Sequence, residues 1–314
     1  MFGSSSIMGK RPSQQDALCL GEKVNQNVRM YGVFDGHGSL GGGRCSKLAA
    51  RKLKTFIANG LTEAKCTDAV DTKAVEEVVV KAFQQFDDHL RTLPKIDKED
   101  SLPKKSKFSR LFGKYPRADF DQSGSCGCVV LETEDNYIVA NLGDSRAIFS
   151  DGSRITSDHT TMSLTEIARL YEAGGWTIQN RLFGALVPTR TFGNFIYKKL
   201  GKNGEMALSN KPEVFVIPRN PDMPKFIVIM CDGVHDALKD CEIGKLVQAN
   251  EALDADEIAR TITDKAFARG SKDNISCIVI RTNRSARIPK SSSVSSLEAQ
   301  TADIDSDASS LSGI

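Results

Sequence analysis

The sequence predicts a fold that mixes α-helices with β-strands, and three observations support this. Short apolar runs rich in β-branched residues recur along the chain, as in residues 29–34, 226–231 and 275–281. Longer segments instead repeat their apolar residues at helical spacing, most clearly in residues 72–93. Hydrophobic residues make up 40% of the 314 residues, which is enough for a sizeable core in one large domain or two small ones.

The first part of the chain is expected to contain a loop, a strand, a linker and two helices. Residues 9–16 should form the loop, and residues 17–20 the strand that follows it. The glycine-rich residues 38–45 are expected to be a flexible linker into a helix over residues 46–58. The helix over residues 72–93 places valines, an alanine and phenylalanines on one face, so that face should belong to the core.

A segment rich in proline and basic residues interrupts this pattern at residues 94–120. It holds three prolines and eight Lys or Arg residues, which indicates a surface insertion. Two interpretations are open. Phe108, Leu111 and Phe112 within the basic cluster could dock on an acidic partner or a membrane, or the whole segment could be a solvated loop.

Two strand segments follow, over residues 124–131 and 136–150, and we expect them to form an antiparallel meander. Asp151 and Gly152 should then provide a hairpin turn.

Residues 164–173 are predicted to form a helix with a capping box at its start. Ser163 precedes the helix and Glu166 comes three residues later, the spacing at which two side chains satisfy free backbone N–H groups. Gly174 and Gly175 should end the helix.

The rest of the core is expected to come from strands and helices nearer the C-terminus. Residues 181–195 are loop-like, and a strand over residues 213–217 leads through prolines to the next apolar run. Helices should follow near residues 241–250 and 254–268, and the last apolar run closes the core.

The composition changes near residue 286. Residues 291–314 contain nine serines and few large apolar residues, so they cannot bury enough apolar surface to fold alone. We therefore expect a folded domain over residues 1–285 and a disordered, Ser-rich tail over residues 286–314, with the tail a candidate for phosphorylation.

Charge and cysteine content argue against several classes of protein. The net charge is 42 − 40 = +2, which gives no strong bias toward nucleic acid or a membrane surface as a partner. Eight cysteines are scattered without a Cys-x-x-Cys pair, which argues against structural zinc. Because we find no signal peptide and no apolar run long enough to span a bilayer, we expect an intracellular protein, cytoplasmic or nuclear, with free thiols.

Aspartates recur beside the apolar runs. Asp35, Asp144 and Asp232 each follow such a run, and Asp273 precedes the last one. A single Asp-Gly after a strand usually marks only a turn. Recurrence at several strands instead indicates hard oxygen ligands brought together at strand ends, which suits magnesium or manganese. His37, close to Asp35, is a residue type that can carry a proton near neutral pH.

Nine short motifs, in order, resemble those of the metal-dependent protein phosphatases of type 2C. Each motif alone has modest specificity, but nine in the correct order over residues 9–280 are highly specific. The motifs are GKRPSQQDA (9–17), YGVFDGHG (31–38), SGSCG (123–127), NLGDSRA (141–147), SDHT (157–160), EAGG (172–175), RTFGN (190–194), CDGVHD (231–236) and KDNIS (272–276).

The resemblance implies an α+β fold of two stacked antiparallel β-sheets flanked by helices, an α-β-β-α sandwich with a binuclear metal site at one end. It also implies hydrolysis of phosphoserine and phosphothreonine in proteins by a metal-activated water, without a phosphoenzyme. The implied cofactors are two magnesium or manganese ions per active site, with a weak third. Phosphate monoesters hydrolyse very slowly without a catalyst, and two metals can neutralise their charge and lower the pKa of water.

The resemblance also assigns metal ligands, motif by motif. Asp35 would bridge both metals, and the carbonyl of Gly36 would bind one of them. Asp232 and Asp273 would bind the other. Gln15 stands where many members of the family have a glutamate, and it would lie on the Asp35 side of the site.

Asp144 and Asp236 match positions near the weak third metal, and Asn274 would help to orient the cluster. Three further residues are implied to be catalytic. Arg11 would hold the substrate phosphate, for which its planar fork is well suited. His37 would protonate the leaving oxygen, and Asp16 would orient metal-bound water.

Three positions depart from the family pattern. Gln15 removes one negative charge from the site, so metal binding should be weaker. Asn194 replaces an aspartate that commonly follows the R-x-x-G motif, and His235 replaces a tryptophan. The principal metal aspartates are all present.

The leading hypothesis is therefore an active protein serine/threonine phosphatase. The alternative is a pseudophosphatase, a binding or scaffold protein with a weakened metal site. A scaffold has no reason to keep Arg11, Asp35, His37, Asp232 and Asp273 together. We expect phosphorylated proteins as substrates, a monomeric protein, and neither nucleic-acid binding nor a membrane span.

Overall fold

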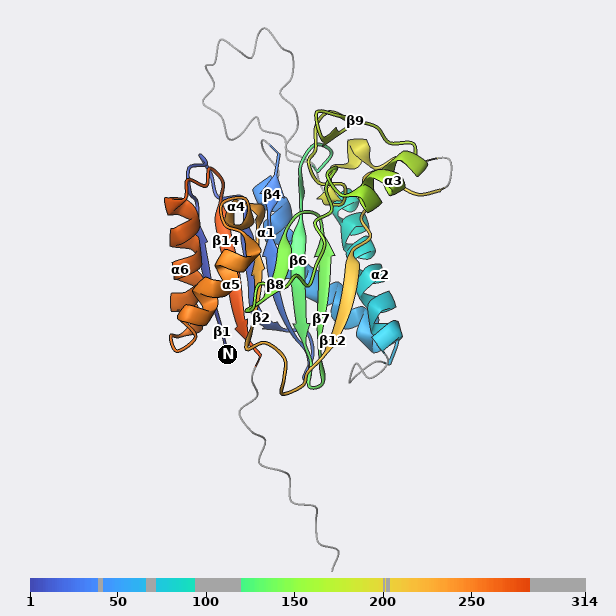
Figure 1. Ribbon diagram of the computed structural model, residues 1–314. Coiled ribbons are helices and arrows are strands. Elements are labelled where there is room, and N and C mark those ends of the chain that lie inside the picture. The colour runs from blue at the N-terminus through green and yellow to red at the C-terminus, as the bar shows by residue number, and fades with distance from the viewer. Residues whose placement is uncertain (39–41, 66–71, 94–119, 200, 202–203, 283–314) are drawn as a thin grey trace, which may run out of the picture. The chain divides into compact units, whose positions relative to one another are not determined.

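Two antiparallel β-sheets stack face to face at the centre of the computed structural model (Figure 1). The structure describes residues 1–282 except residues 39–41, 66–71, 94–119, 200 and 202–203. The five-stranded sheet has the order β12 (Glu213–Pro218), β7 (Asn136–Leu142), β6 (Gly127–Glu132), β3 (Arg29–Phe34) and β2 (Ala17–Lys23). The four-stranded sheet has the order β1 (Phe2–Ile7), β14 (Ile275–Arg281), β13 (Phe226–Met230) and β8 (Arg146–Phe149).

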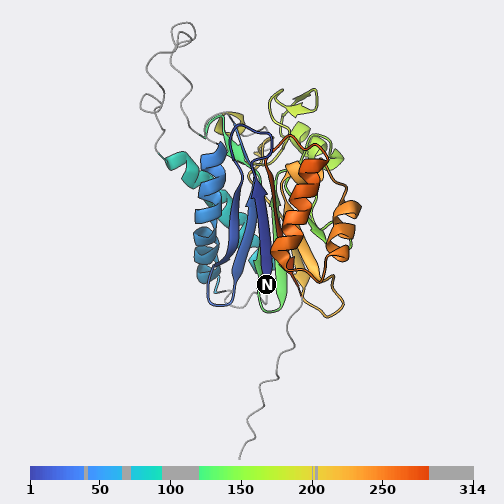
Figure 2. The ribbon, with the colours of Figure 1, turned by 90° about the vertical axis from the view of Figure 1, so that its left-hand side faces the viewer.

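Helices cover the outer face of each sheet, on opposite sides of the molecule (Figure 2). The five-stranded sheet packs against α1 (Gly42–Glu63) and α2 (Thr72–Thr92). The four-stranded sheet packs against α4 (Asp232–His235), α5 (Asp240–Ala249) and α6 (Ala255–Ala268). A third apolar cluster fills the space between the sheets and includes Val33, Val130 and Ile229. These layers confirm the α+β sandwich that the family resemblance implied.

Apolar periodicity explains how the outer layers form. In α2, Val75, Val79, Phe83 and Phe86 follow each other at three- or four-residue spacing and are all buried. Each fully buried side chain of this size contributes roughly 1.5–3 kcal/mol. Truncating Phe86 to alanine should therefore cost about 3–5 kcal/mol, because its cavity would open inside the core.

Smaller elements lie at one end of the sandwich. A three-stranded sheet has the order β11 (Phe192–Gly193), β5 (Gly124–Ser125) and β4 (Gly36–His37), and a two-stranded sheet joins β10 (Arg181–Leu182) to β9 (Thr177–Ile178). The helix α3 (Leu164–Glu172) and the 3-10 helix η3 (Phe195–Tyr197) belong to the same region (Figure 1). The segment 181–195, predicted as a loop, therefore contains short strands.

Most predicted elements are confirmed. The helices over residues 72–93, 164–173, 241–250 and 254–268 form close to their predicted limits, as do the strands of the two main sheets. Strand β1 was not predicted, because its Ser4, Ser5 and Ser6 hide the apolar pattern of a strand. In the structure β1 pairs along its whole length with β14, from Phe2 opposite Ile280 to Ile7 opposite Ile275.

The predicted linker over residues 38–45 is wrong in its second half. Helix α1 begins at Gly42, earlier than the predicted residue 46. The glycine serves close packing there, because a Cβ atom at Gly42 would lie 2.6 Å from the carbonyl oxygen of His37. The first turn of α1 is thus fitted against the loop that carries the Asp35 motif.

The predicted meander over residues 124–150 is also only partly correct. β6 and β7 pair as expected, but β8 leaves their sheet and pairs with β13 in the other one. The chain crosses between the sheets at Gly143, whose φ of +105° is a backbone conformation that side chains disfavour. The crossover places Asp144 at the end of the sandwich. The predicted turn at Asp151 and Gly152 is confirmed, with the N–H of Phe149 donating to the carbonyl of Ser153.

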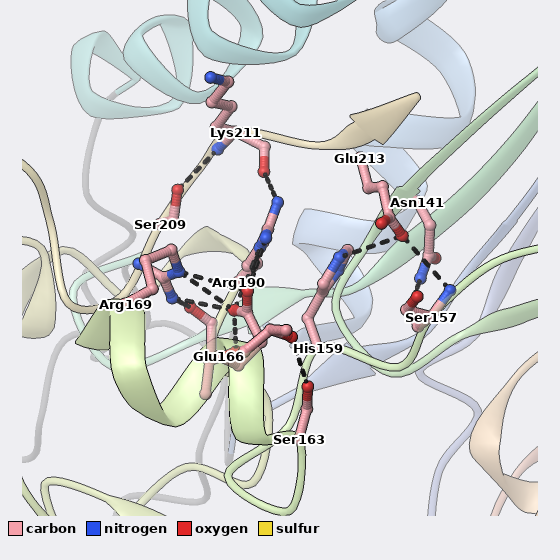
Figure 3. A network of polar contacts seen from close by, with 12 residues as sticks. Asn141, Ser157, His159, Ser163, Glu166, Arg169, Arg190, Ser209, Lys211 and Glu213 are labelled. Atoms are coloured by element: carbon pink, nitrogen blue, oxygen red, sulfur yellow. Dashed lines mark hydrogen bonds and ion pairs between the residues drawn. The ribbon is translucent and has the colours of Figure 1, made fainter. Parts of the chain in front are cut away.

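The predicted capping box of α3 is wrong, although the helix itself is confirmed. The hydroxyl of Ser163 pairs with that of Thr165, 2.9 Å away, and caps no backbone N–H. Glu166 turns inward instead and binds Arg169 and Arg190 (Figure 3). Two partly buried guanidinium groups attract a carboxylate more strongly than one backbone N–H does.

Two predictions fall outside the described residues, namely the basic insertion at 94–120, of which only Phe120 is described, and the tail over 286–314. The two-part division of the chain therefore stays a prediction. Among the described helices, none is long and apolar enough to cross a membrane.

Candidate metal centre and active site

Aspartates from four parts of the chain meet at one end of the sandwich. Asp35 follows β3, Asp144 follows the crossover from β7, Asp232 starts α4 just after β13, and Asp273 comes two residues before β14. These ends lie together because β13 and β14 are antiparallel neighbours, with Met230 opposite Cys277. The sequence-based expectation of carboxylates gathered at strand ends is confirmed.

Mutual repulsion shows how closely the carboxylates are placed. Burial raises the pKa of Asp35 well above its usual range, and the negative charges of Asp232 and Asp16 raise it further. The pKa of Asp232 is also raised well above its usual range, by burial and then by Asp144 and Asp273. Bound cations would relieve the repulsion among these carboxylates, so the cluster should bind cations strongly.

Two carboxylate oxygens in this cluster are enclosed without a hydrogen-bond partner among the described residues, Oδ1 of Asp16 and Oδ1 of Asp232. The other oxygen of Asp16 accepts a 2.6 Å hydrogen bond from Ser276, and burial raises the pKa of Asp16 to about 6. Buried polar atoms are normally paired, so these oxygens are oriented for a ligand. Hard oxygen donors fit magnesium or manganese.

One thiol lies beside the carboxylates. Single donor atoms of Asp16, Asp35 and Cys231 lie within 4.8 Å of one another. The sulfur of Cys231, however, accepts the N–H of Ser276 at 3.2 Å and donates to the carbonyl of Asn274 at 3.4 Å. Burial raises the pKa of this thiol well above its usual range, so it stays protonated. The residues of this cluster therefore fit a cation that is bound by oxygen atoms and not by sulfur.

Arg11 lies at the edge of the cluster. Its guanidinium forms an ion pair with Oδ2 of Asp273, and its side chain is 54% exposed. The hydrogen bond to Asp273 raises the pKa of Arg11, and the charges of Asp232 and Asp35 add to this effect. An exposed, permanently charged fork beside an acidic centre can bind an incoming anion.

Asn274 fixes the loop that carries Arg11. Its Nδ2 donates to the carbonyls of Met8 (2.8 Å) and Ser13 (3.0 Å), and its Oδ1 accepts the N–H of Gln15 at 2.9 Å. The three bonds hold residues 8–15 across the end of β14. Asn274 thus has the orienting position that the sequence suggested.

Gln15 lies against the Asp35 motif. Its Nε2 donates to the carbonyl of Gly38 at 2.8 Å, so the amide uses its donor side to hold this loop. Gly36 is packed closely in the same place, because a Cβ atom there would lie 2.4 Å from the carbonyl of Gly42 and 2.5 Å from that of Gln15. Only glycine fits at position 36.

His37 is turned toward Asn194, a contact that the sequence did not predict. Its Nε2 lies 2.7 Å from Oδ1 of Asn194. Burial lowers the pKa of His37, so the neutral ring is favoured at rest. No sequence signal joins two residues that stand 157 positions apart.

His235 connects Asp144 with Asp236. Its Nε2 donates to the carbonyl of Asp144 at 2.8 Å, and its Nδ1 lies 3.6 Å from a carboxylate oxygen of Asp236. Burial lowers the pKa of His235. The carboxylate of Asp236 is 76% exposed, whereas Asp144 is buried. Of this pair, predicted to serve a weak third metal, one carboxylate is therefore open to solvent.

Further side chains hold the Asp144 loop from the other side. His159 Nδ1 accepts the N–H of Gly143 at 3.2 Å, and its Nε2 lies 3.6 Å from Glu213 (Figure 3). Asn141 donates to the carbonyls of Gly143 and Ser157. These residues were not predicted, although the SDHT motif contains His159.

An open cavity of about 280 Å³ adjoins the cluster, lined by Asp236 and Asp273 together with Arg269 and Lys272. It leaves open space beside the carboxylates of Asp236 and Asp273. Its mixture of acidic and basic residues matches a site that must hold both cations and anions.

Comparisons with known proteins agree with this geometry. The family model described as "Protein phosphatase 2C" matches residues 1–275. "Probable protein phosphatase 1N" of Mus musculus is 29% identical over 289 residues; the match covers 89% of this chain and 64% of that relative. This chain thus spans less than two thirds of that relative's length.

Solved structures share the fold. The crystal structure of a phosphatase from a pathogenic strain of Toxoplasma gondii has a TM-score of 0.65 at 21% identity and covers 89% of this chain and 91% of its own. A Caenorhabditis elegans sex-determining protein has a TM-score of 0.67 at 22% identity, covering 90% of this chain and 65% of its own. The match of the family model over most of the chain shows that it belongs to the protein phosphatase 2C family.

Proposed function

We propose that this chain is a metal-dependent protein phosphatase that hydrolyses phosphoserine and phosphothreonine in proteins. The main support is a single observation. Mutually repelling buried carboxylates, two with unpartnered oxygens, lie beside the exposed guanidinium of Arg11. A dianionic phosphate ester needs both a cation-binding centre and a positively charged side chain.

Two magnesium or manganese ions would be held by this cluster. Asp35 would serve both ions. The carbonyl of Gly36 and the Gln15 side would serve one of them, and Asp232 and Asp273 the other. When bound, the ions supply positive charge that stabilises the phosphate and lowers the pKa of water.

Asp144 and Asp236 would serve a weaker third ion. The exposure of Asp236 supports a lower affinity there, since water competes for an exposed carboxylate.

Three side chains of the protein act on the substrate in this proposal. Arg11 binds the phosphate oxygens with its planar fork once the phosphate has taken the place of Asp273 as its partner. The unpaired Oδ1 of Asp16 accepts a hydrogen bond from the attacking water and so orients it. His37 gives a proton to the serine or threonine oxygen as the P–O bond breaks, because an alkoxide is a poor leaving group.

The alternative was a pseudophosphatase. All five residues that a scaffold would not need (Arg11, Asp35, His37, Asp232 and Asp273) are present, and four of them are coupled through their charges. Phosphorylated proteins are the proposed substrates, and we propose a monomer acting in the cytoplasm or nucleus.

The test is hydrolysis of a phosphothreonine peptide by the purified chain, with manganese, with magnesium and with chelator. We expect phosphate release that depends on added metal and disappears in Asp232→Asn. Glu172→Gln, an exposed change on α3, is the matched control and should keep full activity. A wild-type protein that binds manganese without releasing phosphate would favour the pseudophosphatase instead.

A further inference from the structure

The cavity beside the acidic centre contains two cationic side chains that the proposed function does not use. It lies between α4 and the loop over residues 269–274, which joins α6 to β14. The proposed function assigns Asp236 and Asp273 to metal ions, but it gives no role to Arg269 and Lys272, which line the same cavity. The volume of about 280 Å³ is below the range of about 300–1,000 Å³ of pockets for separate small molecules. The cavity therefore suits one side chain of a bound protein better than a separate ligand.

Hydrogen bonds fix the backbone that carries Lys272. The N–H of Ser271 donates to the carbonyl of Ala266 at the end of α6 at 3.1 Å. The buried hydroxyl of Ser271 donates to the carbonyl of Gly233 in α4 at 2.7 Å. Gly270, with a φ of +94°, makes the turn between them in a conformation that only glycine adopts readily. The two walls of the cavity are thus bonded to each other, and Lys272 extends from a rigid loop.

Both cations can accept an anionic partner. Lys272 is exposed and forms no ion pair with any residue that the structure describes. Arg269 is half exposed, and Nη2 of its guanidinium donates to Glu242 at 2.9 Å. Within the described part of the chain, Nε and Nη1 of Arg269 have no acceptor. An ammonium group and two guanidinium nitrogens are therefore free to donate hydrogen bonds to an anion.

Metal binding would leave the cavity with an excess of positive charge. Ions bound by Asp236 and Asp273 would offset the negative charge of these two carboxylates, whereas nothing would offset that of Lys272. A site with this charge attracts anionic groups and repels cationic ones. The cavity of the metal-loaded protein should therefore select for an anionic side chain.

The cavity adjoins the arginine that is proposed to bind the scissile phosphate. Arg11 forms an ion pair with Asp273, which directly follows Lys272 and itself lines the cavity. Gly9 is packed against the same residue, because a Cβ atom there would lie 2.0 Å from the carbonyl oxygen of Asp273. An extended peptide covers about 10 Å in three residues. A peptide whose phosphate binds Arg11 can therefore bring a nearby side chain to the cavity.

We propose that Lys272 and Arg269 form a specificity subsite for an anionic side chain of the substrate. The ligand is an aspartate, a glutamate or a second phosphorylated residue within three positions of the phosphoserine or phosphothreonine. This inference rests on the proposed phosphatase function, and it narrows the substrate class to phosphoproteins with an acidic sequence around the phosphorylated residue.

The first test measures the preference of the wild-type protein in saturating manganese. Phosphothreonine peptides carry a glutamate or a phosphoserine at one of the three positions on either side, and the reference peptide carries alanine throughout. We expect kcat/KM for the best anionic peptide to be about fivefold above that for the alanine peptide. The glutamate and phosphoserine sets show which anion the subsite prefers, and a gain with either supports it. Raising sodium chloride from about 50 to about 500 mM should reduce the ratio toward one, because salt screens exposed charges. Equal kcat/KM for alanine and every anionic peptide would overturn the inference.

The second test changes the subsite. Lys272→Gln should lower the ratio of kcat/KM between the anionic and alanine peptides to below about twofold. Lys272→Glu should instead favour a peptide with lysine at the same position. The matched control is Lys245→Gln, which removes the same charge from an exposed position of α5 outside the cavity and should keep the wild-type ratio. The ratio cancels any general effect on metal binding. An unchanged ratio in Lys272→Gln would refute the role of Lys272.

The third test separates the subsite from the reaction. Phosphonate analogues of the best peptide and of the alanine peptide cannot be hydrolysed, and fluorescence anisotropy in manganese measures their binding. We expect about fivefold tighter binding of the anionic analogue to wild type, and no preference in Lys272→Gln. If wild type shows this preference but releases phosphate from no peptide, the subsite stands and the proposed function fails. If it releases phosphate without any preference, the function stands and the subsite is wrong.

Discussion

The protein buries carboxylates in two contrasting ways. At the metal centre, Asp35 and Asp232 lie among other carboxylates, and their pKa values are raised well above the usual range. Glu166 of α3 is also enclosed, but it contacts Arg169 and Arg190 (Figure 3). Burial alone would raise the pKa of Glu166, but hydrogen bonds from Arg190 and Arg169 lower it far below its usual range.

The difference distinguishes a cluster that can bind a ligand, the acidic centre, from one that only stabilises the fold, the Glu166 cluster. The Glu166 cluster is complete within the protein, since Glu166 also accepts a 2.5 Å hydrogen bond from Thr189. The acidic centre is incomplete, with the enclosed oxygens of Asp16 and Asp232 unpaired within the described residues. A cluster whose polar groups are all paired within the protein stabilises the fold. A cluster with unpaired carboxylate oxygens lowers the stability of the free protein but can bind a ligand tightly.

The largest expected effect is that of Asp232→Asn. Loss of one metal ligand should lower turnover at least about a thousandfold, because the metals contribute several kcal/mol of charge stabilisation. The metal-free protein should melt at the same or a higher temperature than wild type, since the change relieves repulsion. Turnover and thermal unfolding in chelator are the measurements. A normal rate, or a clear loss of stability, would show that Asp232 belongs to the scaffold.

Glu166→Gln should do the reverse. It leaves Arg169 and Arg190 without their carboxylate, so unfolding free energy should fall by about 3 kcal/mol. The control is Glu172→Gln on the exposed side of the same helix, which should change stability by less than about 0.5 kcal/mol. Urea unfolding measures both. If the two variants are equally stable, the paired cluster does not hold the α3 region.

The two sites should also respond to pH in opposite directions. Asp16, with a folded pKa of about 6 against an unfolded value near 3.9, should cost the metal-free protein about 3 kcal/mol as pH rises from about 4 to 6. Glu166 has a folded pKa below its unfolded value, so its stabilisation is present above about pH 4 and is lost in acid.

Urea unfolding in chelator between pH 3 and 7.5 tests this, comparing wild type with Asp16→Asn and Glu166→Gln. Asp16→Asn should gain stability relative to wild type as pH rises. Glu166→Gln should approach wild type as pH falls. If the unfolding free energies of all three proteins change in parallel with pH, the two sites do not differ in their response to pH.

The smallest expected effect concerns Gln15. A glutamate there adds a negative charge beside the Asp35 motif, so the half-saturating manganese concentration should fall about tenfold, equivalent to about 1.4 kcal/mol. The change also removes the donor to the carbonyl of Gly38, so the metal-free protein should be slightly less stable. Activity titrated against manganese gives the result. Coincident titration curves would mean that Gln15 acts only by holding the loop.

The gathering of carboxylates was the most predictable feature because its signals are local. Asp35, Asp232 and Asp273 each stand beside a strand with a clear apolar pattern, and the motif order supplied the rest. The apolar patterns predicted most strands and helices, but their arrangement as a sandwich came from the family resemblance, and exceptions remain where pattern and pairing differ. The serines of β1 face neighbours such as Thr263 and Ser276, so a buried strand looks polar in sequence.

The structural ion pairs were much less predictable than the acidic centre, because they join positions far apart in the sequence. Asp87 looks like an ordinary surface acid within α2, and only the tertiary structure brings it to Lys198, 111 residues away. Glu166 fitted a local capping pattern, but two arginines competed for it successfully. A charged residue's partner therefore cannot be inferred from spacing when the competing interaction is long-range.

The pairing of β1 with β14 has a consequence for synthesis of the chain. Arg11, Gln15 and Asp16 follow β1, and Asp273 precedes β14, so the first and last residues of the acidic centre come from segments about 260 residues apart. During translation the early residues must wait until β14 has left the ribosome before they meet their partners. The centre should therefore form at the end of folding, and incomplete chains should be unable to bind metal or release phosphate. A nascent chain of this design should not gain the proposed activity until its domain is complete.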